Sequence, residues 1–191
     1  MIPPVYDIAF IGTSLTSNRV GGWQSAFKQR LQLEATIDVR CYDAGTPGGT
    51  TADMYPLSVR AAMLRPRAVV IEAGMNDAPV SQGISVAQFK TNVIAMIAQV
   101  QGLSPNSAIF LMTMNPVVAP PGSSENAARL PDYYEALREL SVSEGVGLID
   151  VEPLWGSPTT TEIPDGVHPT LVAENAVLVP KLMATFLPLV A

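Results

Sequence analysis

Residues 5–14 read VYDIAFIGTS, a nearly continuous apolar run that ends in a glycine and two hydroxyl residues. A short apolar run bounded by a turn signal is typical of a strand buried on both faces of a parallel sheet. Four further runs have this character, and stretches of helical length lie between them. The predicted strands are residues 5–11, 37–42, 68–73, 108–112 and 146–150. The predicted helices are residues 23–33, 52–64, 86–103 and 133–144, with a last helix that begins after Pro169.

Strand and helix alternate five times, which predicts an α/β fold with helices on both faces of a five-stranded parallel sheet. The chain has 191 residues, of which 48% are apolar and 15% charged. This size fits one domain over residues 1–191, and no internal repeat or linker divides it. The composition excludes a disordered or fibrous protein. Cys41 is the only cysteine, so no disulfide within the chain is possible, and its apolar neighbours predict an inert core thiol.

The net charge of −6, without a basic stripe, argues against binding to nucleic acid or to an anionic membrane surface. Residues 177–191 are apolar, but prolines interrupt them and they are shorter than the ~20 residues that cross a bilayer. We therefore expect a packed terminal helix and no integral membrane association. Residues 1–4 lack the charged start of a signal peptide. That suits a cytoplasmic protein or a domain of a larger one and leaves the location open.

His168 is the sole histidine and follows the fifth predicted strand, in the turn-rich segment DGVH at residues 165–168. In parallel sheets, chemistry collects where loops leave the carboxyl ends of the strands. Imidazole is the side chain best suited to move protons near neutral pH. Asp165, three residues earlier, can accept the imidazole N–H and fix its tautomer. The alternative is a helix-capping Asp165 beside an incidental His168.

Ser14 comes directly after the first predicted strand. A serine hydroxyl is a weak nucleophile without a base to take its proton, and most serines in turns cap helices or close the turn. The segment is not the G-x-S-x-G nucleophile elbow, because Thr16 stands where that motif has glycine, which argues against the usual α/β-hydrolase fold.

Two further loops are suited to hold negative charge. Residues 43–50 read DAGTPGGT, so backbone N–H groups can approach a ligand closely, although the lysine of a phosphate-binding loop is missing. Residues 74–77 read GMND, and they place Asn76 just past the third predicted strand. Its amide can close an Asx turn or point at a developing oxyanion.

With these blocks in place, the chain resembles the SGNH hydrolases, also called the GDSL esterase/lipase family. Residues 12–15 (GTSL) stand where the family has Gly-Asp-Ser-Leu, and residues 165–168 (DGVH) match its closing Asp-x-x-His block. Residues 74–77 (GMND) are similar to Gly-x-Asn-Asp, and residues 45–50 (GTPGGT) resemble the second block. Each motif is short, but all four occur in the family's order and in the expected strand context.

The resemblance implies a flavodoxin-like three-layer fold and acyl transfer without a metal or other cofactor. It implies Ser14 as the nucleophile, His168 as the general base and Asp165 as the acid of the triad. The oxyanion hole would consist of the N–H groups of Ser14 and Gly45 and the side-chain amide of Asn76. The expected partner is a small-molecule or carbohydrate ester, because relatives act on acetylated sugars, short-chain esters, lysophospholipids and thioesters.

Two departures from the family pattern bear on activity. Thr13 replaces the Asp beside the nucleophile, and Asp43 stands where Asn is frequent. Thr13 is the main support for a rival interpretation, a non-catalytic carbohydrate-binding or assembly domain. A binding domain, however, would not need to retain Ser14, Asn76, Asp165 and His168 together.

We infer the substrate class from the two segments expected to line the cleft, residues 115–125 and 156–164. They carry small and hydroxyl-bearing side chains, including three consecutive threonines. Such walls suit a short acyl group on a polar alcohol better than a long lipid chain, so we expect removal of O-acetyl groups from carbohydrate.

Overall fold

The computed structural model describes residues 4–17, 19–118 and 124–190, and within them five parallel strands form one sheet in the order β2-β1-β3-β4-β5. This flavodoxin-like order confirms the predicted α/β class. Gly12 pairs with Gly45 and Glu72 pairs with Met112, so the strands end side by side at one edge of the sheet. The strands are β1 (Val5–Gly12), β2 (Asp38–Gly45), β3 (Ala68–Glu72), β4 (Ala108–Met112) and β5 (Gly147–Ile149).

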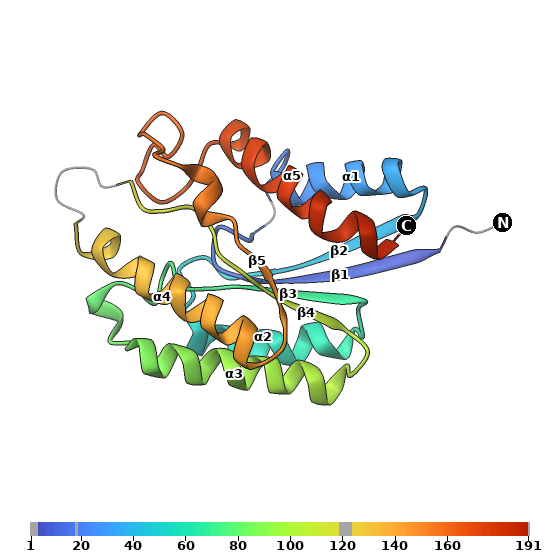
Figure 1. Cartoon of the computed structure of the whole chain (residues 1–191), viewed down its shortest axis with the longest axis horizontal. Coiled ribbons are helices and arrows are strands. Elements are labelled where there is room, and N and C mark those ends of the chain that lie inside the picture. Colours follow the sequence, from blue (N-terminus) through green and yellow to red (C-terminus); the bar gives the residue numbers. More distant parts are fainter. Residues whose placement is uncertain (1–3, 18, 119–123, 191) are drawn as a thin grey trace.

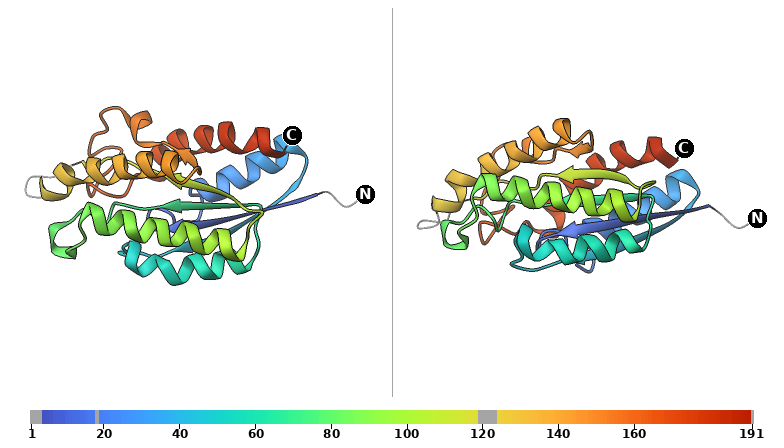
Figure 2. Two further views of the ribbon diagram at one scale, coloured as in Figure 1. Left: turned by 60° about the horizontal axis from the view of Figure 1, so that its bottom comes forward. Right: turned by 90° about the horizontal axis from the view of Figure 1, so that it is seen from below.

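Helices cover both faces of the sheet and make three layers (Figure 1). One face carries α1 (Trp23–Ala35) and α5 (Leu171–Val190), which pack against each other. The opposite face carries α2 (Thr51–Met63), α3 (Val86–Leu103) and α4 (Ser124–Ser143), with α3 between the other two. The turned views show both helical layers with the sheet between them (Figure 2). Two 3₁₀ turns, η1 (Val80–Gln82) and η2 (Glu152–Trp155), lie in the connecting loops.

The core is continuous across the sheet because its central strands are buried on both faces. Every residue of β3 is buried, as the apolar run predicts. On the α1/α5 face, Phe10 meets Trp23 edge to face with ring centroids 5.1 Å apart, and Phe27 meets Phe186 at 5.4 Å. Each fully buried Phe contributes about 1.5–3 kcal/mol relative to an exposed one, so this cluster fixes α1 and α5 on the sheet.

Most predicted boundaries lie within a few residues of the observed ones, and α4 is the main exception. It begins at Ser124, nine residues before the predicted start at residue 133. Pro131 lies inside the helix. A proline removes one backbone hydrogen bond but does not stop a helix whose face is held by packing. Tyr133 and Leu137 of α4 are completely buried in the core and supply that packing.

By length and composition α5 would qualify as a membrane span, a test that core helices of soluble proteins also pass. Leu178, Leu182 and Phe186 are fully buried, so α5 packs as a terminal helix on α1 and β5, as predicted. Cys41 is only half-buried, short of the expected core position. Burial still raises the pKa of its thiol to about 12, so the thiol stays protonated and unreactive at neutral pH.

Candidate active site

The nucleophile candidate lies in a tight turn at the carboxyl end of β1. The backbone N–H of Thr16 donates to the carbonyl of Thr13 at 3.1 Å, and the Leu15 N–H donates to Thr13 Oγ1 at 3.1 Å. Trp23 Nε1 donates to the Leu15 carbonyl at 3.0 Å and ties the turn to the start of α1. Ser14 projects from this turn and remains partly exposed, while its neighbours on both sides are buried.

Ser14 Oγ lies 2.8 Å from His168 Nε2, and His168 Nδ1 lies 2.7 Å from Asp165 Oδ2. With the ring proton on Nδ1, the Ser14 hydroxyl donates to Nε2 and the ring donates to the carboxylate. In this arrangement the imidazole can take the serine proton while the carboxylate stabilises the resulting charge. The structure therefore brings together the three side chains that the sequence analysis singled out as a triad.

The base loop is shaped by its own aspartate. Asp165 Oδ1 accepts the backbone N–H of Val167 at 2.9 Å and of His168 at 2.6 Å. Gly166 has a φ of +85°, which favours glycine in the turn. Partial burial acts to raise the pKa of Asp165, but these N–H groups and the His168 ring outweigh it and lower the pKa to about 2. The carboxylate is thus ionised at any neutral or mildly acidic pH.

Neighbouring segments hold the base loop in place. Asn115 Nδ2 donates to the carbonyl of Val167 at 2.8 Å, from the loop that follows β4. From the other side, Arg19 Nη2 donates to the carbonyl of Pro169 at 3.1 Å and forms an ion pair with the buried Glu174. Arg19 belongs to the loop that carries Ser14, so it links the nucleophile loop directly to the residue after His168.

Asn76 lies past the end of β3, as predicted. Its Nδ2 donates one hydrogen to the carbonyl of Gly49 at 3.0 Å, and an amide has a second hydrogen to offer. The segment is anchored by Asp77, whose Oδ1 accepts the N–H and the hydroxyl of Thr51 at 3.0 and 2.5 Å. Asp77 therefore fixes the start of α2 against the loop that carries Asn76.

Gly45 is the backbone donor that the sequence analysis expected in the oxyanion hole. Its N–H donates to Asp43 Oδ1 at 2.8 Å and is not free to meet a substrate oxygen in this arrangement. A glycine is nevertheless required here, because a Cβ at this position would lie 2.5 Å from the backbone nitrogen and the hydroxyl of Ser17. Gly45 thus allows the β2 loop to approach the loop of Ser14.

Gly48, which lies in the block of residues 45–50, is a further backbone donor of this loop. Among the described residues, its N–H has no acceptor, whereas the N–H of Gly49 donates to the Thr46 carbonyl at 2.9 Å. Gly48 has a φ of +72° and is exposed, and the Gly49 carbonyl next to it accepts from Asn76. Pro47-Gly48 was the available sequence signal, because this dipeptide marks a turn.

Glu72, the last residue of β3, was missed. It is completely buried, and its Oε2 accepts the N–H of Thr13 at 2.7 Å and the Thr13 hydroxyl at 2.8 Å. Thr13, the departure from the family pattern, therefore both donates to Glu72 and accepts from Leu15. The turn around Ser14 is closed with threonine in the position of the family aspartate.

The expected cleft walls are described in part. Of the first, residues 115–118 are described and residues 119–123 lie outside the described residues. Ser157 and Thr159–Thr161 of the second are exposed. Across the described ranges, no group of three His, Cys, Asp or Glu side chains is arranged to hold a metal ion.

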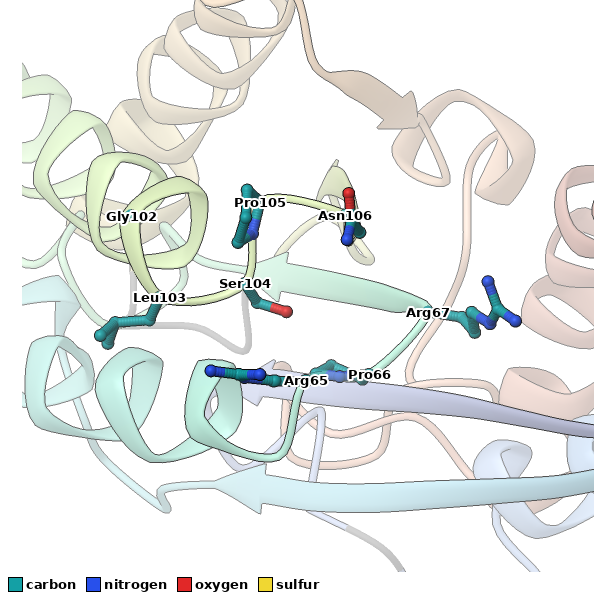
Figure 3. Close-up of a pocket in the computed structure, with 8 residues that line it drawn as sticks. All are labelled: Arg65, Pro66, Arg67, Gly102, Leu103, Ser104, Pro105 and Asn106. Atoms are coloured by element: carbon teal, nitrogen blue, oxygen red, sulfur yellow. The ribbon is translucent and has the colours of Figure 1, made fainter.

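A cavity of about 480 Å³ lies far from these residues, at the amino ends of β3 and β4. Arg65 and Arg67 line it, but their side chains point in opposite directions (Figure 3). Two guanidinium groups that diverge do not form an anion site, and none of the triad side chains reaches this end of the sheet.

Solved structures of similar fold include a lipase/acylhydrolase from Enterococcus faecalis, 22% identical, with a TM-score of 0.79 and 96% of each chain covered. A catalytic mutant of an acetylxylan esterase from Geobacillus stearothermophilus is 16% identical, with a TM-score of 0.80 and coverage of 96% of this chain and 94% of that one. TesA is 22% identical, with a TM-score of 0.72 and coverage of 96% and 99%.

These similarities show the fold, and no curated protein sequence matches the chain. The family is shown by sequence, because the profile of the GDSL-like lipase/acylhydrolase family matches residues 10–172. That range contains all four sequence blocks and the whole Ser14–His168–Asp165 arrangement. The chain belongs to the GDSL-like lipase/acylhydrolase family and is an ester hydrolase of the SGNH type.

Proposed function

We propose that this esterase works by two-step acyl transfer through Ser14, with His168 as general base and Asp165 as the group that orients it. One observation carries the proposal: the continuous chain of contacts from Ser14 Oγ through the His168 ring to Asp165, at 2.8 and 2.7 Å. His168 accepts the Ser14 proton as the hydroxyl attacks the ester carbonyl and gives it to the leaving alcohol. Water then attacks the acyl-enzyme with the same base.

The oxyanion is proposed to be held by the Ser14 N–H and the free amide hydrogen of Asn76, together with one backbone N–H of the β2–α2 loop. The sequence suggested Gly45 for the last position. The contacts favour Gly48, since Gly45 already donates to Asp43 while the Gly48 N–H is unoccupied among the described residues. Donors fixed before the reaction stabilise the developing charge without reorganisation.

The substrate we propose is a short-acyl ester, above all an O-acetyl group on a carbohydrate. Ser157, Thr160 and Thr161 are exposed and carry hydroxyls on one expected wall of the cleft, which suit a polar alcohol. An acetylxylan esterase is among the proteins of similar fold, which is consistent with this choice. A small-molecule acetate ester would be processed by the same side chains.

The decisive experiment compares Ser14→Ala with the matched control Ser17→Ala on p-nitrophenyl acetate and on acetylated xylo-oligosaccharide. Ser17 lies in the same loop, and its hydroxyl faces the Thr13 carbonyl instead of His168. Ser14→Ala is expected to lower turnover roughly 10³-fold or more with the fold intact, and Ser17→Ala to retain it. An organophosphonate should label Ser14 in the wild type.

Full activity in Ser14→Ala, or an adduct on another serine, would exclude Ser14 as the nucleophile. If acetate were released from p-nitrophenyl acetate but not from the oligosaccharide, the proposed mechanism would stand and the proposed carbohydrate substrate would be rejected. Absence of turnover on either ester, with no phosphonate adduct, would favour the rival binding or assembly domain.

A further inference from the structure

Glu72 is a completely buried carboxyl group that the proposed chemistry does not use. Its Oε2 accepts three hydrogen bonds, two from Thr13 and one from the Thr16 hydroxyl at 3.0 Å. All three donors flank Ser14, which lies between them in the sequence. Oε1 has no hydrogen-bond partner among the described residues. Because all the hydrogen bonds of the Glu72 side chain come from the turn around Ser14, Glu72 is placed to fix the conformation of that turn.

The backbone of β1 is built around this contact. A Cβ at Gly12 would lie 2.2 Å from Thr16 Oγ1 and 2.5 Å from Glu72 Oε2, so no larger residue fits while Glu72 holds the turn. Burial raises the pKa of Glu72, while the N–H and hydroxyl groups of Thr13 and Thr16 act to lower it. Hydrogen bonds to a buried carboxyl group are strong because the surrounding medium screens them little.

Glu72 also connects two parts of the proposed oxyanion hole. It ends β3, and Asn76 follows four residues later on the same loop. Glu72 is hydrogen-bonded to Thr13, the residue before Ser14. It therefore fixes the orientation of the Ser14 N–H relative to Asn76. A displacement of ~1 Å at such a site can cost about 10²-fold in rate.

We propose that Glu72 is a positioning residue of the esterase site, which holds the Ser14 turn through Thr13 and Thr16. This inference rests on the proposed role of Ser14. It also accounts for Thr13 beside the nucleophile, because the Thr13 hydroxyl donates a hydrogen bond to the buried Glu72 carboxyl group.

The test measures kcat per competent site, with sites counted by the burst of a chromogenic organophosphonate. Thr13→Val removes the donor with little change of shape, Thr13→Ser restores it, and Glu72→Gln weakens the acceptor. Thr113→Val is the matched control, because Thr113 is equally buried at the end of β4 and bridges Asp150 to backbone N–H groups.

Thr13→Val and Glu72→Gln should each lower kcat per site by about 10- to 100-fold while KM changes less than about threefold. Thr13→Ser should recover most of the loss. The double variant should lose little more than either single one, because both changes break the same contact. Thr113→Val should lower the melting temperature and leave kcat per site unchanged.

Wild-type kcat per site in Thr13→Val and Glu72→Gln would overturn the inference, as would an equal fall of kcat in Thr113→Val. If neither variant folds, Thr16→Val, which removes the third donor, decides the matter, and an unchanged kcat there rejects the positioning role. Failure of the proposed function is distinguishable, since it would appear as activity retained by Ser14→Ala.

Discussion

Asp43 Oδ1 accepts the N–H of Gly45 at 2.8 Å, and this contact occupies the expected oxyanion donor at the end of β2. Three residues later the N–H of Gly48 has no acceptor in the described part of the chain. If Gly45 were the working oxyanion donor, Asp43 would compete with the substrate oxyanion for the Gly45 N–H. The loop would have to release this contact in each turnover.

Asp43→Ala separates the two possibilities. With Gly48 as the donor, freeing the Gly45 N–H should bring no gain in kcat. Loss of the hydrogen bond from the Gly45 N–H alone should cost about 1 kcal/mol in unfolding free energy. Steady-state kinetics on p-nitrophenyl acetate and thermal unfolding measure the two effects. A rise in kcat would instead identify Gly45 as a donor that Asp43 restrains.

The fold followed from local patterns because its central strands are buried on both faces, and burial of this kind leaves apolar runs that can be read directly. Residues 108–112 and 86–103 match β4 and α3 without change. The start of α4 could not be predicted in this way. Pro131 ends a helix by local rules, whereas the helix continues because Tyr133 and Leu137 are packed in the core.

The candidate triad was predictable for a different reason. His168 has no competing histidine, and Asp165 lies within one turn of it in sequence. Glu72 carries no such signal, since a glutamate at the end of an apolar run resembles any surface carboxylate. Its meaning comes from a contact with Thr13, 59 residues away, that exists only after β1 and β3 pair. Gly45 differs from Glu72, because its N–H is occupied by Asp43, only two residues away, in a local contact that the family motif does not report.

Asn76→Ala tests the side-chain half of the oxyanion hole. It should cost about 2.7–4 kcal/mol of transition-state stabilisation, expressed mainly in kcat. Gln99→Ala is a suitable control, because Gln99 Nε2 donates to the Tyr55 hydroxyl and loses a comparable hydrogen bond outside the network that holds Asn76. An effect on KM alone would make Asn76 a binding residue.

Asp165→Asn should slow turnover less than loss of Ser14 or His168, since the imidazole can still accept a proton when it is less well oriented.

The Asp165→Asn substitution should also change how the free energy of unfolding depends on pH. Folding lowers the pKa of Asp165 from 3.8 to about 2, so the ionised group stabilises the folded state above the unfolded value. That stabilisation is lost as the pH falls through about 2.

The difference in melting temperature between wild type and Asp165→Asn should therefore be full at neutral pH and vanish near pH 2. Calorimetry between pH 2 and pH 7 measures it. A difference that stays constant over this range would show that the contacts of the carboxylate do not depend on its charge.

The pH dependence of kcat/KM tests His168 as the base. The ring must be unprotonated at Nε2 to accept the hydrogen of Ser14 Oγ, 2.8 Å away, so kcat/KM should rise with pH in a single step. Asp165, with its pKa at about 2, is ionised throughout an assay from pH 5 to 9 and adds no second step.

His168→Ala should lower kcat/KM as far as Ser14→Ala does and remove the step, with stability checked by calorimetry. If the variant kept substantial activity with the same rise, another group would be the base. If the step persisted in wild type but moved with leaving-group acidity, a step other than proton removal would limit the rate. A series of acetate esters with different leaving alcohols distinguishes these outcomes.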